Sequence, residues 1–245
     1  MEEQWEYRAV LAVDIEKSSG RGNVPLLENR ETLRSVLRAA CARGGVDWEA
    51  CARADLGDGL RLVAPAGTRK ASLVHPLVHA LADLLTAHNS AARDAATRFR
   101  VRVALHAGEV CLLPGGEVAG SPLETLARLL DAPAAREALA AAPWPVPLSL
   151  LMSQHFYDET VRHGYEGIDP GQFHRVGVEV KELATHAWLH TPGWTPALPK
   201  PGGRGRDRRP GGPAGGSTMV NNASRGGVVN ASQNGDQHIT VTRGR

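Results

Sequence analysis

Two aspartates lie where short apolar segments end, and their positions suggest metal chemistry. Asp14 interrupts the apolar stretch AVLAVDI at residues 9–15, and Asp58 lies between two glycines in LGDGL. A carboxylate at the end of a buried strand is costly unless something pairs with it. If the segment around Asp58 forms a hairpin beside the first strand, both carboxylates converge at one edge of a sheet. Hard cations such as Mg²⁺ bind one or two carboxylates together with substrate phosphates.

The aspartate pair alone leaves two interpretations open. An aspartate at a strand end is often a turn residue or a helix cap. The glycines on either side of Asp58 permit a tight turn and leave room for a phosphate or a metal. Two divalent ions about 3.5–4 Å apart would suit a phosphoryl displacement. The two aspartates alone do not distinguish a structural role from a chemical one, so the surrounding sequence is needed.

The first half of the chain predicts elements that could hold these aspartates. Residues 7–14 predict a strand, and its Val10, Leu11 and Val13 are typical of a strand buried on both faces. Residues 25–43 show a helical period that Gly44-Gly45 ends. The segment 46–65 predicts a hairpin that turns at residues 57–59, and residues 72–92 predict an amphipathic helix.

The second half predicts more strands and helices. From Phe99 to Leu105 apolar residues alternate with arginines, which predicts a strand with one solvated face. A turn at residues 106–108 would end this strand, and a return strand would follow at 110–113. Ser121 and Glu124 have the spacing of a capping box for the next helix. The remaining elements are a strand at 147–153, a helix at 153–164 and strands at 173–180 and 186–190. This order predicts a mixed α/β fold with antiparallel hairpins.

Charge is unevenly distributed along the 245 residues. The net charge is +2, but residues 193–245 carry eight Lys or Arg against two Asp, and the first 192 residues therefore carry −4. A mildly acidic globular part argues against a nucleic-acid partner.

The remaining composition predicts a cytoplasmic protein. There is no run of 18 apolar residues, so no membrane span is expected. The N-terminal MEEQWEYR lacks the apolar segment of a secretory signal. Three cysteines without a CxxC spacing predict neither a disulfide framework nor a zinc site.

The C-terminal region divides the chain into three parts. Residues 1–192 form the predicted domain, 193–216 a Gly/Pro/Arg-rich linker, and 217–245 a tail in which NASRGGVV and NASQNGDQ repeat with a period of eight residues. Either this tail is disordered, or its Asn/Gly repeats with Val and Ile stack as a cross-β assembly. The tail resembles short amyloid-type signalling motifs, a resemblance that implies a partner protein carrying the same motif.

Residues 5–192 resemble the class III adenylyl/guanylyl cyclase catalytic domain in the order of their motifs. The layout of the chain is similar to that of actinobacterial stand-alone members of this family. The motifs that carry this resemblance are AVDIEKSS, LGDGLRLV, VRVALHAGEV, GSPLETLARLL and LSLLMSQHFYD. The resemblance implies an α+β, ferredoxin-like fold with a mostly antiparallel sheet flanked by helices. It also implies a head-to-tail homodimer with active sites at the interface.

The resemblance further implies the roles of individual residues. Asp14, Asp58 and the carbonyl of Ile15 would hold two Mg²⁺ or Mn²⁺ ions. Arg128 would neutralise the transferring phosphoryl group from the other subunit. The reaction would convert a nucleoside triphosphate, ATP or GTP, to its 3′,5′-cyclic monophosphate and pyrophosphate. Lys17 could contact the phosphates beside Asp14.

Three positions depart from the family pattern. The ribose-orienting Asn of the family is Glu124 here. The position of the adenine-selecting Lys, or guanine-selecting Glu, is Ala54, and the position of its Asp or Cys partner is Glu117. Alanine cannot hydrogen-bond a base, and Arg53 points the other way if the strand alternates. Three interpretations stay open: an unselective cyclase, a homologue with altered chemistry, or a nucleotide-sensing signalling module without catalysis.

Overall fold

The computed structural model describes residues 3–20, 22–180 and 183–195. The predicted assembly motif at 217–245 lies outside the described residues, as does the linker from residue 196 onward. The three-part division of the chain therefore stays a prediction.

The described residues form one eight-stranded sheet. The strand order is β2-β3-β1-β4-β6-β8-β7, and β5 pairs with β4. Neighbouring strands are antiparallel except β4 and β6, which are parallel. The strands are β1 (Gln4–Ile15), β2 (Ala52–Asp55), β3 (Gly59–Val63), β4 (Val101–Leu112), β5 (Val118–Ala119), β6 (Leu148–Ser153), β7 (His174–Val180) and β8 (Leu183–His190). The predicted mixed, mostly antiparallel α/β fold is confirmed.

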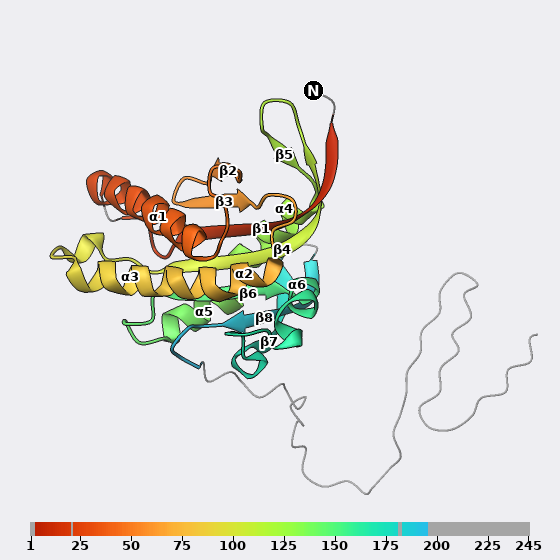
Figure 1. The fold of residues 1–245 in the computed structure, drawn as a ribbon. Helices are drawn as coiled ribbons and strands as arrows, with labels where there is room; N and C mark the ends of the chain where they lie inside the picture. The colour runs from red at the N-terminus through yellow and green to blue at the C-terminus, as the bar shows by residue number, and fades with distance from the viewer. Residues whose placement is uncertain (1–2, 21, 181–182, 196–245) are drawn as a thin grey trace, which may run out of the picture. The chain divides into compact units, whose positions relative to one another are not determined.

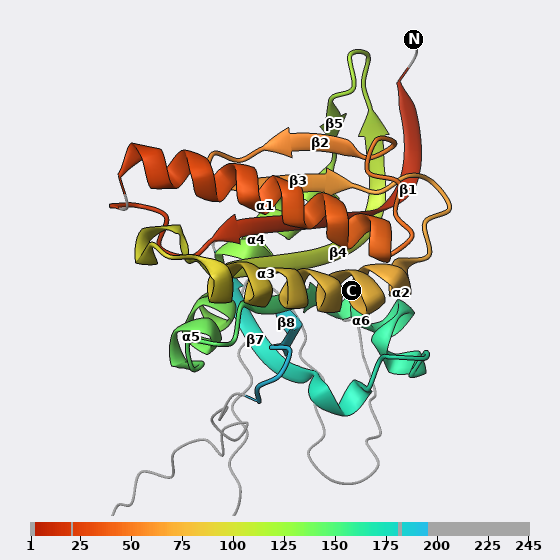
Figure 2. The ribbon, with the colours of Figure 1, turned by 60° about the vertical axis from the view of Figure 1, so that its left-hand side comes forward.

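Helices cover both faces of this sheet. In Figures 1 and 2, α1 and α3 lie on one face and α4 lies on the other. The α-helices are α1 (Asn23–Arg43), α2 (Lys70–Ser72), α3 (His79–Ala91), α4 (Ser121–Asp131), α5 (Pro133–Ala141) and α6 (Gln154–Glu159). A π-helical turn, η1 (Leu73–Val78), joins α2 to α3, and three 3₁₀ turns are η2 (Ala95–Thr97), η3 (Val161–His163) and η4 (Pro170–Gln172). Among the described residues, no helix combines the length and apolarity needed to cross a membrane.

The alternation of side chains along β1 assigns Asp14 to one face. Leu11 and Val13 belong to the core cluster beneath α1 and α3, whereas Val10 and Ala12 belong to the cluster beneath α4. Because successive side chains of a strand point to opposite faces, Asp14 continues the series of Val10 and Ala12. The carboxylate therefore projects on the α4 side of the sheet.

The predicted turn at residues 106–108 is wrong. β4 continues to Leu112, because β1 pairs with it along its whole length, from Ile15 opposite Val101 to Gln4 opposite Leu112. Gly108 lies inside this strand, where a Cβ would come within 2.6 Å of the Pro122 side chain. The glycine thus permits close approach of α4 to the sheet, and β5 provides the return strand instead.

Two helix starts also differ from expectation. The helix predicted at 72–92 is interrupted at His75, whose φ of −138° and ψ of 125° are extended, and α3 begins at His79. The capping box is absent, because Gly120 is the N-cap of α4 and no side chain caps it. Pro122 occupies the first turn of α4, where the missing amide donor costs little.

Candidate functional site

The structure brings Asp14 and Asp58 together. Asp14 lies opposite Gly59 in the β1–β3 ladder, and the amide of Ile15 donates to the carbonyl oxygen of Asp58 at 3.1 Å. Asp58 lies in the tight turn between β2 and β3. Gly57 in this turn has a φ of 90°, a conformation that favours glycine, and Gly59 lies with its ideal Cβ position 2.2 Å from the Val13 carbonyl oxygen. The predicted convergence of the two carboxylates is thus present in the fold.

Asp14 is held by an arginine on the neighbouring strand. Arg102 lies directly opposite Asp14 in the β1–β4 ladder and donates through Nε to Oδ1 at 3.0 Å and through Nη2 to Oδ2. Only 7% of Asp14 is exposed. Burial raises the pKa of Asp14 from 3.8 to about 6, the guanidinium of Arg102 opposes this rise, and Asp58 and Asp131 add to it. Arg102 is therefore the group that compensates this buried carboxylate in the described chain.

Arg100, just before β4, and Arg102, within it, are largely shielded from solvent, contrary to expectation. Arg100 and Glu16 are both buried and form a two-point ion pair, with Nε to Oε2 at 2.9 Å and Nη2 to Oε1 at 3.2 Å. Like Asp14 and Arg102, this pair joins the end of β1 to the start of β4. The alternation in the sequence correctly places the arginines on one face, but that face is covered and paired with acids.

The turn after β1 places further polar groups next to Asp58. Ser18 donates from its hydroxyl to Oδ2 of Asp58 at 2.6 Å. Lys17 is exposed and adopts a φ of 51°, a left-handed conformation that non-glycine residues rarely take. This turn places Lys17 three residues after Asp14 and next to Ser18, which contacts Asp58. The expectation that Lys17 contacts phosphates stays a prediction.

The two aspartates fit a divalent cation whose coordination is completed by other oxygens. The described residues contain no group of three or more His, Cys, Asp or Glu side chains able to hold a metal ion. Mg²⁺, however, usually keeps several waters and binds through one or two carboxylates plus substrate phosphates. Two adjacent carboxylates match this donor set, provided that Arg102 shares or releases Asp14.

Helix α4 turns its polar residues away from the sheet. Its buried residues include Leu123, Leu126 and Leu129, which pack in the cluster with Val10 and Ala104. Glu124 and Arg128 lie one turn apart on the opposite side, with Glu124 exposed and Arg128 half-buried. Because α4 packs its leucines on the sheet, both residues lie on the side of the helix away from the sheet.

A cavity brings Ala54 and Glu117 together. It has a volume of about 400 Å³ and lies between the β2–β3 hairpin and the loop that joins β4 to β5. Sequence reasoning missed one residue of this cavity, Arg61, which lies directly opposite Ala54 in the β2–β3 ladder. The sequence could have indicated Arg61, because it is the single charged residue in the apolar stretch GLRLV of β3.

Known structures share this fold. The guanylyl cyclase Cya2 superposes with a TM-score of 0.55 at 13% identity, covering 78% of this chain and 93% of Cya2. The adenylyl cyclase CyaB from P. aeruginosa gives 0.53 at 10% identity, covering 78% of this chain and 95% of CyaB. A bacterial light-regulated adenylyl cyclase gives 0.56 at 12% identity, with 77% of this chain matching 52% of that protein.

Sequence comparisons give no matching relative, since no protein-family model and no curated protein matches the chain. The structural likeness therefore establishes the fold. The chain has the fold of adenylyl and guanylyl cyclase domains, as the order of its motifs predicted.

Proposed function

We propose that the protein is a class III-like nucleotidyl cyclase. The observation that carries this proposal is the convergence of Asp14 and Asp58 at one end of the β1–β3 pair, in a fold that cyclase domains share. The reaction forms a bond between the ribose 3′-oxygen and the α-phosphorus and breaks the bond from that phosphorus to the bridging oxygen. The 3′-hydroxyl loses its proton, and the products are a 3′,5′-cyclic nucleotide and pyrophosphate.

Asp14, Asp58 and the carbonyl of Ile15 are the residues that would hold Mg²⁺ or Mn²⁺, two ions per site. Such ions neutralise phosphate charge and lower the pKa of a hydroxyl nucleophile. Arg102 holds the carboxylate of Asp14 in a fixed orientation, and Ser18 holds that of Asp58. Ser18 thus orients Asp58 for a ligand, whereas Asp14 has to exchange at least part of its contact with Arg102 for the metal.

A second copy of the chain would supply the arginine of this site. Arg128 lies on the side of α4 that faces away from the sheet. A homodimer that packs this side against the α4 face of its partner would bring Arg128 toward the triphosphate. A guanidinium suits that role because it donates two parallel hydrogen bonds to phosphate oxygens. Glu124 would lie beside it, where a carboxylate adds negative charge instead of the family's amide.

A second function has one observation in its favour. The bidentate pairing of Arg102 with Asp14 occupies the very carboxylate that a metal needs. In this alternative the domain binds a nucleotide without cyclising it, and the tail recruits a partner protein by amyloid-like assembly. The expected cytoplasmic location fits both functions.

Cyclase activity of the full chain tests the proposal. ATP and GTP are offered separately with Mn²⁺, and products are resolved by mass. We expect a cyclic nucleotide from the wild type, and a loss of at least a hundredfold in Asp58→Ala because removing a metal ligand disrupts charge stabilisation. The matched control is Asp83→Ala, an exposed aspartate on α3, which should retain activity. A folded wild type that binds nucleotide but forms no cyclic product would favour the alternative.

A further inference from the structure

A cavity on the α3 side of the sheet lies apart from the proposed cyclase site. It has a volume of about 450 Å³ and lies between α3, the end of β8 and the segment from η3 to η4. Its walls include two imidazoles, two carboxylates and two aromatic rings, which belong to His79, His190, Glu166, Asp169, Tyr165 and Phe173. His190 lies opposite Leu150, a member of the core cluster beneath α1 and α3. It therefore projects from the face of the sheet opposite to that of Asp14.

His190 has a buried nitrogen without a partner. The residue is only 2% exposed, and its Nε2 has no hydrogen-bond partner in the described part of the chain. Its Nδ1 lies 3.1 Å from the Gln172 carbonyl oxygen. Because a carbonyl oxygen can only accept, Nδ1 carries the proton, and Nε2 of the neutral ring is an acceptor. A buried acceptor without a donor costs free energy, and a ligand with an N–H group would satisfy it.

A second imidazole next to His190 has the same tautomer. Nδ1 of His79 lies 3.2 Å from the Val74 carbonyl oxygen, so Nε2 of this ring is an acceptor as well. The centroids of the His79 and His190 rings are 5.7 Å apart. Burial lowers the pKa of His79 and lowers that of His190 to about 4, so both rings are neutral at pH 7. Each ring therefore has an acceptor nitrogen, and neither has a positive charge.

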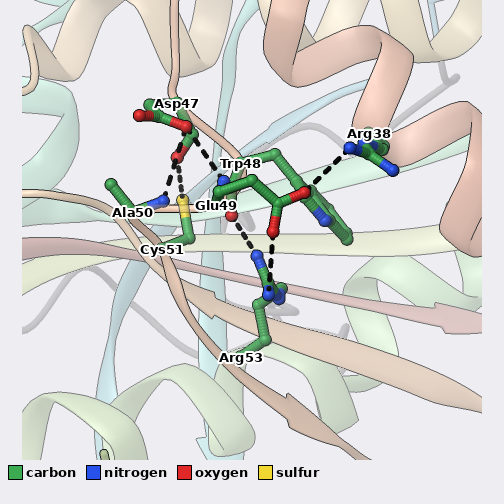
Figure 3. A network of polar contacts seen from close by, with 7 residues as sticks. All are labelled: Arg38, Asp47, Trp48, Glu49, Ala50, Cys51 and Arg53. Atoms are coloured by element: carbon green, nitrogen blue, oxygen red, sulfur yellow. Dashed lines mark hydrogen bonds and ion pairs between the residues drawn. The ribbon is translucent and has the colours of Figure 1, made fainter.

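A polar network between α1 and β2 provides a contrast, because it is complete within the chain. Figure 3 shows Glu49 between two arginines, with its carboxylate 2.8 Å from Arg38 and 3.4 Å from Arg53. Arg53 also donates to the Trp48 carbonyl oxygen and lies over the Trp48 ring at 5.2 Å. These contacts agree with the expectation that Arg53 points away from the base-selecting position. Each charged group of this network thus has a partner, which the buried histidine nitrogen lacks.

The loop beside the two histidines adds negative charge to the cavity. Glu166 and Asp169 are exposed, and neither forms an ion pair with a basic side chain in the part of the chain that the structure describes. Asp169 accepts from the Gly171 amide at 2.9 Å through Oδ1. The guanidinium of Arg69 lies over the Tyr165 ring at 5.0 Å, but Arg69 does not line the cavity. Acceptor nitrogens and carboxylates without a lining lysine or arginine favour a cationic ligand.

The donor set and the size of the cavity favour an organic cation over a metal ion. The described residues contain no group of three side chains able to hold a metal ion. A volume of about 450 Å³ lies in the range of cavities that bind small molecules. Phe173 is buried and stacks on the His190 ring at 4.5 Å, and Tyr165 is exposed. Aromatic rings next to carboxylates suit a cation that carries an apolar body.

We propose that this cavity binds a small organic amine in its ammonium form. The ammonium group donates to the imidazole nitrogens and the carboxylates, and the apolar body of the ligand packs against Tyr165 and Phe173. The ligand class is therefore a primary amine on an aromatic or other apolar body. The proposal does not rest on cyclase activity, because no residue that lines the cavity belongs to the proposed cyclase site.

Titration with a model amine tests this proposal. The full chain is titrated by calorimetry with benzylamine, with benzyl alcohol, which has the same ring but no charge, and with Zn²⁺ alone. We expect benzylamine to bind at least tenfold more tightly than benzyl alcohol. The double variant Glu166→Gln with Asp169→Asn should lower affinity for benzylamine at least fivefold and leave affinity for benzyl alcohol within twofold. The matched control is Glu137→Gln, an exposed residue on α5, which should change neither affinity.

A variant of the buried histidine tests the acceptor nitrogen. His190→Phe keeps an aromatic ring beside Phe173 and removes Nε2. In a chain that circular dichroism shows to be folded, we expect at least a fivefold loss of affinity for benzylamine. The double variant at the exposed carboxylates tests the same cavity without changing the core.

Four results would overturn the proposal. Equal affinities for benzylamine and benzyl alcohol would show that the cavity does not recognise charge. Benzylamine binding that is unchanged in both variants would show that the amine binds elsewhere on the protein. Binding of Zn²⁺ but not of benzylamine, lost in His190→Phe, would make the histidines a metal site. A wild-type chain that binds none of the three probes would have no such ligand site, whether or not it forms a cyclic nucleotide.

Discussion

At the scale of single residues, the pairing of Asp14 with Arg102 determines how a carboxylate can be buried in this sheet. The positions of Asp14 and Asp58 could be predicted, because an acid after an apolar run and an acid between glycines are visible in the sequence. Arg102 could not be recognised as the partner, because alternation gives the face of a side chain but not the residue opposite it. Only the register of β1 against β4 provides that information.

Removing this arginine should destabilise the fold in a pH-dependent way. In Arg102→Ala the buried carboxylate of Asp14 loses its counterion, and we expect a loss of about 3 kcal/mol in the free energy of unfolding at pH 7. The pKa of Asp14 is already raised to about 6 in the fold. A raised carboxylate pKa makes the folded state bind protons more readily, so stability falls as pH rises from about 4 to 6.

Urea unfolding at pH 5 and pH 7 measures this effect. The loss in Arg102→Ala should be smaller at pH 5, where Asp14 is protonated. The double variant with Asp14→Asn should be more stable at pH 7 than Arg102→Ala alone. Equal losses at both pH values would show that Arg102 contributes by packing and not by charge.

A buried histidine gives the opposite pH dependence. Burial lowers the pKa of His190 to about 4, the hydrogen bond from Nδ1 to the Gln172 carbonyl oxygen opposes this, and His79 and His174 lower it further. The unfolded chain therefore binds a proton at higher pH than the folded one, and stability is lost as pH falls from about 6.5 to 4. At pH 5 the loss from this group is about 2 kcal/mol relative to pH 7.

The variant His190→Gln tests this value, because glutamine does not titrate. Its free energy of unfolding should drop less between pH 7 and pH 5 than that of the wild type, by about 2 kcal/mol. Should both proteins lose the same amount, His190 would not be the titrating group.

At the scale of elements, the β2–β3 hairpin was predictable, whereas the length of β4 and helix α5 were not. The GDG sequence marks the hairpin directly. In β4, His106-Ala107-Gly108 has the composition of a turn, but pairing with β1 keeps it extended. The alanine-rich α5 shows little apolar periodicity, and it forms because its own Ala135, Ala138 and Leu139 are buried against the rest of the domain. In both cases tertiary contacts override local sequence.

The packing of Gly59 tests the geometry of this hairpin. In Gly59→Ala the new Cβ would lie 2.2 Å from the Val13 carbonyl oxygen, so the β1–β3 pair must shift. We expect a loss of about 3 kcal/mol in unfolding free energy, because a crowded backbone cannot relax cheaply. The control is Gly177→Ala in β7, where nothing lies within 4 Å of the added carbon. If the two variants are equally stable, β1 and β3 are not packed as described.

At the scale of the whole molecule, the sequence predicted the fold through the order of its motifs more than through any single one. The order of motifs does not show which side of α4 is buried. In the structure α4 buries its leucines, and Glu124 and Arg128 lie on its outer side. In the proposed cyclase, Arg128 acts from the outer side of α4 on the site of a second copy, so that each site of the proposed homodimer combines the acids of one chain with the arginine of the other.

Complementation between two inactive variants tests this account most directly. Full-length Asp14→Ala and Arg128→Ala are assayed for cyclic nucleotide formation, separately and after mixing under conditions that exchange subunits. We expect each variant alone to be inactive and the mixture to regain activity, because one site of the mixed dimer contains both native residues. A mixture as inactive as its components, made from variants that still exchange subunits, would contradict a site shared between two copies.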